Sequence, residues 1–457
     1  MSAADNAVTK GNAVSKGSVV AALAGHALRV REQDLQGGAE AAARNALVDW
    51  LAAALGGSAQ PIVTALLDGL EPGSGSSRVV GRGVHAVPSL AALINGTAAH
   101  TLELDDIYSP GLFHPGAPVI AAALAAADQC GVTVGRLLRA IAVGYEVGGR
   151  LSADLGPTHY RHWHTTGTAG AVGAAAAVAD VLDLDAARLG HALSLAATTA
   201  GGVQQTFRSD AAGKPLHAGA AAQAGVVAAA AARGGVTGAA DVLEGPAGFA
   251  AATGTTTEWA ASLSTENTRL VVEQVTVKPY PCCGHTFATI DAALELRDRG
   301  VVPAEVAEIV VQTYATAIAT AGIAAPSTDA ERRFSIAHLV CSALVLGPDG
   351  MFTAAAATDP AVQRLVPLVR LAADAHFDSR FPAHRGARVQ LGLADGARPA
   401  VDVPDRSGSP ERPLSAERLA DKFVSTAAPV LGDQARAAYA ALLALDPDAP
   451  VRSLTVG

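Results

Sequence analysis

The sequence predicts a mainly α protein that has a large all-helical domain and a smaller α+β domain. Half of the 457 residues are hydrophobic and only 16% are charged. Much of the apolar content is alanine, whose small side chain lets helices pack closely. After Thr265 the pattern changes to alternating, β-branched segments that are typical of strands. A chain of this length also favours two domains over one.

Helical periodicity dominates residues 18–270, behind a small and polar stretch at 1–17 that we expect to be a disordered tail. Ala41–Leu55 carries an apolar stripe at helical spacing. Pro72–Ser77 is rich in Gly and Ser and predicts a loop, and Asp185 is expected to cap a helix. Because the helical pattern returns in Ser415–Leu445, we assign 406–457 to the same domain.

Residues 271–405 predict the α+β domain. Leu270–Val277 and Val306–Tyr314 alternate and are β-branched, so each predicts a strand. Arg388–Leu393 and Arg398–Val403 flank a turn and predict a hairpin. Between these strands, Thr328 and Glu331 form a capping box that is expected to open one helix running through Leu344.

Charge and cysteine content exclude several classes of protein. A net charge of −9 argues against nucleic acid and anionic membrane as partners. The four cysteines form no CxxC pair, which argues against a zinc site or a disulfide framework. The first residues lack the apolar core of a signal peptide, and the apolar run Thr165–Ala179 is too short to span a bilayer. A reduced, cytoplasmic protein is expected.

The first candidate site is the segment Asn95–His114. If it continues as a helix, His100, Glu103 and Asp106 lie three apart on one face. Asp105 and Asp106 then meet a Ser-Pro-Gly break, with His114 beyond it. Carboxylates and an imidazole at a helix end are suited to proton transfer. An exposed acidic helix end is an equally simple interpretation.

The second candidate site, His159–His164, places three histidines and Arg161 within six residues. His162 and His164 could bind a metal, but no carboxylate motif accompanies them. A surface loop without a role is another alternative. A general base or an anion site is favoured over both. Thr165–Thr168 follows and can cap the next helix, whose free N–H groups attract anions.

The third candidate site is Lys214-Pro215-Leu216-His217, directly ahead of the alanine-rich helix pattern Ala220–Arg233. It is not a phosphate loop, because Pro215 replaces the Ser or Thr and Arg208 replaces the first glycine. Arg208 adds a second cation upstream. Without its context, a lone lysine is most simply a solvated charge.

The fourth candidate site, Lys278–His285, reads KPYPCCGH and lies at the junction of the two predicted domains. Two prolines fix the backbone and present Tyr280, two thiols and His285 together. An inter-domain site and a rigid turn with buried cysteines are both compatible with this pattern. The chain contains no GxSxG elbow, no HExxH motif and no GxGxxG after a strand.

Taken together, these segments resemble the MmgE/PrpD family. The resemblance runs over nearly the whole chain, through the motifs KPLHAG, KPYPCCGH, the Asn95–Asp106 segment with His114-Pro115, and Asp421-Lys422-Phe423. It implies a large all-helical domain formed by the N-terminal part and the returning C-terminus, with a smaller α+β lid. It also implies a homodimer, an active site in a cleft between the domains, and no metal or organic cofactor.

The resemblance carries roles onto matching residues. His164, Lys214 and His114 match active-site residues of the family, and Asp105 and Asp106 match its acidic pair. His164 would act as the base, Lys214 would hold carboxylate charge, and His114 would act as the acid. We expect further substrate contacts from Glu103, Arg161, Arg208, His217, Tyr280 and His285.

The resemblance implies an enzyme that acts on a small di- or tricarboxylic acid. A lyase of the 2-methylcitrate dehydratase type is the first hypothesis, and an epimerase of a succinate-like acid is the second. A cis-aconitate-type decarboxylase ranks third, because Glu103 and Ile107 depart from that enzyme's pattern and Ala315–Pro326 lacks its tyrosine. A non-enzymatic helical scaffold is the remaining alternative.

Overall fold

The chain folds into two compact units. The computed structural model describes residues 17–33, 35, 38–208, 211–264, 266 and 269–455, except for the side chain of Arg208. The helical unit comprises Met1–Thr101, Pro110–Gln274 and Ala420–Gly457, and the α+β unit comprises Leu102–Ser109 and Val275–Leu419. The predicted tail at 1–17 lies outside the described residues, apart from Gly17.

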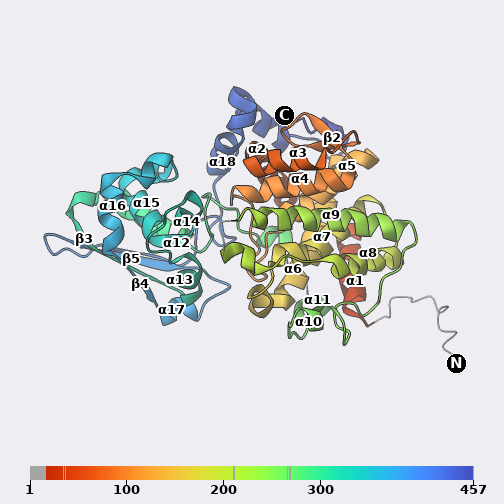
Figure 1. Cartoon of the computed structure of the whole chain (residues 1–457), viewed down its shortest axis with the longest axis horizontal. Coiled ribbons are helices and arrows are strands. Elements are labelled where there is room, and N and C mark those ends of the chain that lie inside the picture. Colours follow the sequence, from red (N-terminus) through yellow and green to blue (C-terminus); the bar gives the residue numbers. More distant parts are fainter. Residues whose placement is uncertain are drawn as a thin grey trace. The chain divides into compact units, whose positions relative to one another are not determined.

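The helical unit confirms the prediction of a mainly α fold (Figure 1). Its long helices are separated by short turns, and a small hairpin precedes the fourth helix. The elements are α1 (Val19–Glu32), α2 (Gly38–Ser58), α3 (Pro61–Leu70), β1 (Ser77–Val79), β2 (Val84–Ala86), α4 (Pro88–Thr101), α5 (Gly116–Cys130), α6 (Val134–Tyr160), α7 (Thr165–Val181), α8 (Ala186–Thr199), η1 (Gln204–Arg208), α9 (Gly213–Arg233), α10 (Phe249–Ala252), α11 (Ala260–Leu263), η2 (Val271–Gln274), α19 (Ala435–Leu443) and most of α18 (Ala416–Leu431).

Helix α7 is the centre of the helical unit. Every residue of α7 is buried, and the helix packs against α5, α6, α8 and α9. Its sequence explains this position, because Gly and Ala leave no long side chain to separate it from its neighbours. The apolar run at Thr165–Ala179 is therefore a buried core helix.

Two glycine contacts bring helix backbones unusually close together. A Cβ atom on Gly219 of α9 would lie 2.2 Å from the backbone oxygen of Leu93 in α4. A Cβ atom on Gly173 of α7 would lie 2.7 Å from the oxygen of Gly144 in α6. Real Cβ atoms do not approach an oxygen this closely, so both crossings depend on glycine.

The C-terminal segment rejoins the helical unit from Ala420 onward. Lys422 of α18 makes a buried ion pair with Asp49 of α2. The helical pattern predicted that all of 406–457 belongs to the helical domain, but residues 406–419 belong to the α+β unit instead. The reason is that hydrogen bonds tie this segment to the α+β unit: the N–H of Ser407 donates to the Asp291 carboxylate, and the N–H of Val277 donates to the oxygen of Gly408.

The α+β unit is built on a four-stranded sheet in the order β4-β3-β5-β6. Strand β3 runs parallel to β4 and antiparallel to β5, and β5 pairs antiparallel with β6. Helix α12 packs on the sheet and on α15, and the inward residues of β3 alternate with more exposed ones. The elements are α12 (Phe287–Asp298), η3 (Pro303–Glu305), β3 (Val306–Thr313), α13 (Ala315–Ala321), α14 (Asp329–Arg332), α15 (Ile336–Gly350), η4 (Ala354–Ala357), α16 (Pro360–Leu365), η5 (Val366–Leu368), β4 (Val369–Ala373), α17 (Ala375–Asp378), β5 (Ala387–Leu393) and β6 (Ala400–Val403).

Two of the predicted elements are wrong in detail. The predicted strand Leu270–Val277 contains the 3-10 turn η2, because the buried Glu146 carboxylate accepts the N–H of Val271 and holds the backbone there. The capping box at Thr328 opens only the short α14. A second cap, Ser335, opens α15 separately.

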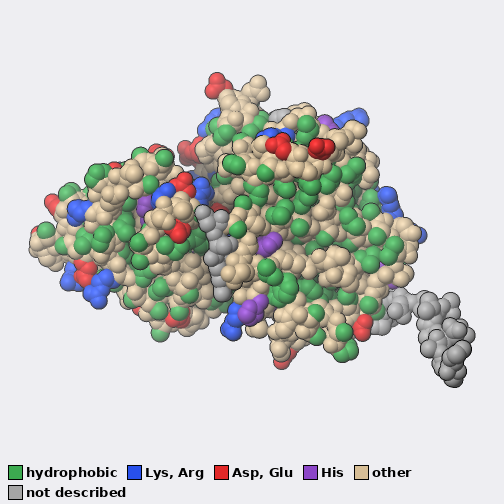
Figure 2. All heavy atoms as spheres, viewed as in Figure 1, with side chains coloured by type: hydrophobic (Ala, Val, Ile, Leu, Met, Phe, Trp, Pro, Cys, Tyr) green, Lys and Arg blue, Asp and Glu red, His purple; other side chains and the backbone are tan. Residues whose placement is uncertain are grey.

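Hydrophobic side chains also reach the surface of the helical unit. On α9, Leu216 and Val227 are 38% and 53% exposed. On the face drawn in Figure 2, hydrophobic side chains are spread over α4 and α9 and charged ones are sparse. Among the described helices, no single one is long and apolar enough to cross a membrane, although α2 and α3 pass that test as a pair bent by 76°.

Gly219→Ala is expected to lower the free energy of unfolding by about 1–3 kcal/mol, because the added methyl group must push α4 and α9 apart. Urea denaturation of both proteins measures the difference. Gly69→Ala in α3 is the matched control, because a Cβ atom there meets nothing within 4 Å. That variant should be unchanged or stabilised by up to about 1 kcal/mol. Equal stability of the two variants would contradict the close-packing argument.

Candidate functional site: a histidine and lysine cluster at two helix N-termini

His164 lies at the N-cap of α7 and is buried. Its N–H donates to the backbone oxygen of Gly202 at 2.8 Å, and its own oxygen accepts the N–H of Gly167 at 2.8 Å. These bonds fix the backbone between α6 and α7. The cap residue of α7 is therefore His164 itself, whereas the sequence favoured one of the threonines that follow it.

Lys214 and His217 lie in the first two turns of α9, three residues apart. Their side chains therefore leave the helix on the same side. His217 Nδ1 lies 3.4 Å from Nδ1 of His164. The ammonium of Lys214 lies 5.4 Å from the ring centre of Phe207, whose edge also meets His164 at 4.8 Å between ring centres. The N-termini of α7 and α9 thus present a lysine and two imidazoles to one place.

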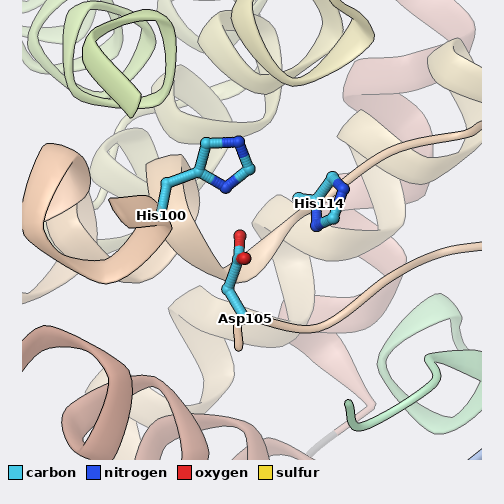
Figure 3. Close-up of side chains that lie close together, drawn as sticks. All are labelled: His100, Asp105 and His114. Carbon is cyan, nitrogen blue, oxygen red and sulfur yellow. The ribbon is translucent and has the colours of Figure 1, made fainter. Parts of the chain in front are cut away.

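Two further imidazoles complete the cluster. His100, at the C-terminal end of α4, has its ring centre 5.4 Å from that of His164. The ring centre of His114 lies 4.9 Å from that of His100, and the two rings are edge-to-face (Figure 3). The N–H of His114 donates to the hydroxyl of Thr166 at 3.2 Å. We call His100, His114, His164, His217 and Lys214 the histidine–lysine cluster; all five belong to the helical unit.

Burial controls the charge of this cluster. Removal from water lowers the pKa of His164 well below its usual value, and His100, Lys214, His114 and His217 lower it further. Burial likewise lowers the pKa of His217, with contributions from His100 and Lys214. Both imidazoles are therefore neutral near pH 7. A neutral imidazole beside an ammonium group can accept a proton while the lysine stabilises developing negative charge.

The acidic candidates lie in the α+β unit, on the segment that follows α4. That helix ends at Thr101, and Glu103 adopts a positive φ of 57°, so His100, Glu103 and Asp106 do not share one helix face. The carboxylates turn instead toward buried Lys278, which lies 3.0 Å from Glu103 and 3.9 Å from Asp105. This ion pair overrides the helical continuation that the spacing suggested. Asp106 is buried as well.

Tyr280 and His285 are buried within the α+β unit. The hydroxyl of Tyr280 donates to the Asp291 carboxylate at 2.9 Å, and burial raises its pKa well above the usual value. Nδ1 of His285 shares a hydrogen bond of 2.7 Å with the hydroxyl of Tyr314. Burial raises the pKa of the Cys282 thiol to about 12, so it is an inert core thiol, as the rigid-turn interpretation required.

The His159–His164 segment separates into buried and exposed residues. Arg161 and His162 are exposed, which does not favour a metal site shared by His162 and His164. His159 is buried and bonds both ring nitrogens, to Thr255 at 3.0 Å and to Thr168 at 2.9 Å. His159 is thus a core residue of the helical unit. The side chain of Arg208, another predicted substrate contact, lies outside the described residues.

Three residues with notable contacts in the structure were not among the predicted site residues. His100 was placed with the carboxylates of a candidate proton-transfer segment but was not among the predicted site residues, and Lys278 was noted only as part of its motif. Phe207, which contacts both His164 and Lys214, follows no recognisable pattern. Phe207 alone could not have been found from the sequence, because it contacts residues of two other elements, His164 at the start of α7 and Lys214 in α9.

The fold and the site define a two-unit, mainly helical protein with a cluster of histidines and a lysine in its helical unit. A family model for the MmgE/PrpD N-terminal domain matches residues 21–262, and one for the MmgE/PrpD C-terminal domain matches residues 280–446. The chain belongs to the MmgE/PrpD family.

Individual relatives are more distant. The chain is 27% identical to the cis-aconitate decarboxylase of Mus musculus over 362 residues, 75% of this chain and 72% of that protein. It is 27% identical to the cis-aconitate decarboxylase of Homo sapiens over 366 residues, 75% and 73% of the two chains. A cis-aconitate decarboxylase-like protein of Aspergillus oryzae is 26% identical over 208 residues, 43% of each chain.

The free energy of unfolding should fall as pH is lowered from about 6.5 to 4, because His159 stays neutral in the folded protein over that range. Burial lowers the pKa of His159 from 6.5 to about 4. The unfolded chain therefore binds a proton first, so this contribution is complete above pH 6.5 and is lost as pH falls toward 4. His159→Gln, which cannot titrate, should lose roughly 2–3 kcal/mol less between pH 7 and pH 4 than the wild type. Urea denaturation at several pH values measures both slopes, and equal slopes would contradict this assignment.

Proposed function

We propose that this chain is a cofactor-independent lyase of the dehydratase type, acting on a small di- or tricarboxylic acid. It removes a proton from a carbon beside a carboxylate and expels a hydroxyl group from the neighbouring carbon. The observation that supports this most is the pairing of buried, neutral His164 with Lys214 and His217 at two helix N-termini. The family relationship to enzymes named for a reaction of cis-aconitate, a tricarboxylate, supports the substrate class.

His164 acts as the base in this proposal. The contact between Nδ1 of His164 and Nδ1 of His217 requires a hydrogen on one of the two atoms. We place it on His164, which leaves the lone pair on its Nε2 to accept the substrate proton. Its lowered pKa keeps this nitrogen unprotonated at neutral pH.

Lys214 stabilises the negative charge that forms. Loss of the proton turns the substrate carboxylate into an enediolate, which needs nearby positive charge because a carbon beside a carboxylate is a weak acid. The ammonium of Lys214 provides it, together with the partial positive charge at the N-termini of α7 and α9. His114, as the acid, protonates the departing hydroxyl so that it leaves as water.

Decarboxylation is the second candidate. The two mammalian relatives are named cis-aconitate decarboxylases, and the match to this chain covers about three quarters of their length. Decarboxylation would use the same lysine to hold the carboxylate and the same histidines to return a proton to carbon. An epimerase would use the base on one face and a second imidazole, such as His114, on the other.

A panel of citrate-like and succinate-like acids, incubated with the protein in D₂O and followed by NMR, separates these reactions. We expect loss of the signal of one hydroxy acid and growth of the vinyl signal of the corresponding alkene, without release of CO₂. CO₂ release would establish the decarboxylase instead. Deuterium at the carbon beside the carboxylate, without water loss, would establish the epimerase. Unchanged spectra for every acid would sink all three assignments.

His164→Ala should lower kcat by about 10²–10⁴-fold, because the reaction then lacks its base. Lys214→Ala should lower kcat about 10²-fold, because the enediolate loses its cation. Steady-state kinetics with the substrate identified above measures both. His162→Ala is the matched control, since it removes an exposed imidazole two residues from His164. It should retain wild-type turnover. Near-normal turnover in His164→Ala and Lys214→Ala would refute these roles.

A further inference from the structure

Three adjacent strands of the α+β unit have their termini at the same end of the sheet: β3 and β6 end there, and β5 begins there. Thr313 at the end of β3 pairs with Ala387 at the start of β5, and Ala387 pairs with Val403 at the end of β6. The residues just beyond these pairs therefore gather at the same end of the strands. They include Tyr314 after β3, Arg385 before β5 and Arg406 after β6.

The two arginines are deeply buried. Arg385 is 5% exposed and Arg406 is 2% exposed. Arg406 donates to Gly284 O at 2.7 Å and to the hydroxyls of Ser109 and Thr276, both at 3.0 Å. Arg385 donates to the backbone oxygen of Ser109 at 3.3 Å, and its buried Nε has no hydrogen-bond partner. Every acceptor that these guanidinium groups contact is uncharged.

No carboxylate of the described residues lies within 4 Å of either guanidinium group. Elsewhere in the same unit, Lys278 pairs with Glu103. The acidic neighbour in sequence, Asp405, is engaged by His384 at 2.7 Å. Glu411 acts on Arg406 only from beyond ion-pair distance. Two buried like charges without a carboxylate in contact are costly, and each repels the other. The repulsion is consistent with a pKa of Arg406 lowered to about 9 by burial and by Arg385, a value at which the group stays charged near pH 7.

Neutral groups beside the two arginines suit an anion. The hydrogen-bonded His285 and Tyr314 have ring centres 5.6 Å apart. Burial, with Arg385 and Arg406, lowers the pKa of His285 well below its usual value, so its ring is neutral and adds no charge beside the two arginines. The guanidinium of Arg385 lies over the ring of Phe381, 5.6 Å from its centre, which holds the planar group in place.

We propose that this end of the sheet binds a small oxyanion, a carboxylate or an inorganic ion of similar shape, through Arg385 and Arg406. The unbonded Nε of Arg385 is the donor that the anion would engage, since a guanidinium group offers a fork that matches two oxygens. The carboxylate can belong to the substrate of the proposed lyase or to a separate anion. Only the first of these sources rests on the proposed function.

Sulfate is the probe, and the thermal midpoint of the full-length protein is the readout. Sulfate is compared with chloride at equal ionic strength, because sulfate also stabilises proteins by exclusion from their surface. The wild type should gain about 3–5 °C more in sulfate than in chloride. Arg385→Met should lose this gain. Arg370→Met is the matched control, because it removes the same charge from β4 at a side chain that is 77% exposed, and it should keep the gain.

Equal gains in all three proteins, or no gain in the wild type, would overturn the proposal. Should Arg385→Met fail to fold, Arg385→Lys replaces it, because lysine keeps the charge and loses the fork. Its gain should shrink, and an unchanged gain would again refute the site. These measurements need no turnover, so an absence of lyase activity would remove the proposed function without touching this inference.

Kinetics then distinguish the two sources of the anion. If the bound group is a substrate carboxylate, Arg385→Met should raise KM about 10-fold or more at little change in kcat, as loss of a charge-assisted hydrogen bond does. If KM is unchanged while the sulfate gain is lost, the site holds a separate anion. Either result supports the oxyanion site and identifies its ligand.

Discussion

Close approach of helix backbones is the constraint on which the helical unit depends. Glycine at the crossings of α4 with α9 and of α6 with α7 leaves no room for a single additional methyl group. Helix α7 can therefore sit inside a ring of helices with every residue buried. Because the axes are so close, histidines at the ends of these helices come together: the ring centre of His164 lies 5.4 Å from that of His100 and 5.5 Å from that of His217. This proximity gives the candidate site its core.

Burial has opposite consequences for the two kinds of polar cluster in this protein. In the histidine–lysine cluster it keeps imidazoles neutral, since the charged form of a histidine is destabilised away from water. The Arg406 guanidinium does not respond in this way, because its pKa, although lowered to about 9 by burial and by Arg385, stays above neutrality. Arg406 therefore retains its charge at the sheet end. The two clusters therefore differ in charge at neutral pH, one holding neutral imidazoles and the other a charged guanidinium group.

Local signals in the sequence predicted much of the fold. The helical stripe at Ala41–Leu55 lies in α2, Asp185 caps α8, and the hairpin near 388–403 is β5 with β6. These features depend on neighbours within a few residues, so periodicity and capping chemistry are enough to find them. The strand β4, which pairs in parallel with β3 across more than fifty residues, left no comparable local signal.

The sequence by itself determined the helical class, the family motifs, and the choice of His164, Lys214 and His114 as candidates. Only the tertiary structure decided which polar residues share an environment. Glu103 and Asp105 lie beside Lys278 and not on a continued helix. Phe207 contacts both His164 and Lys214. The tertiary structure also set two arginines, 21 positions apart, at one sheet end. The physical reason is that charge compensation and burial are properties of residues distant in the chain, which no local period records.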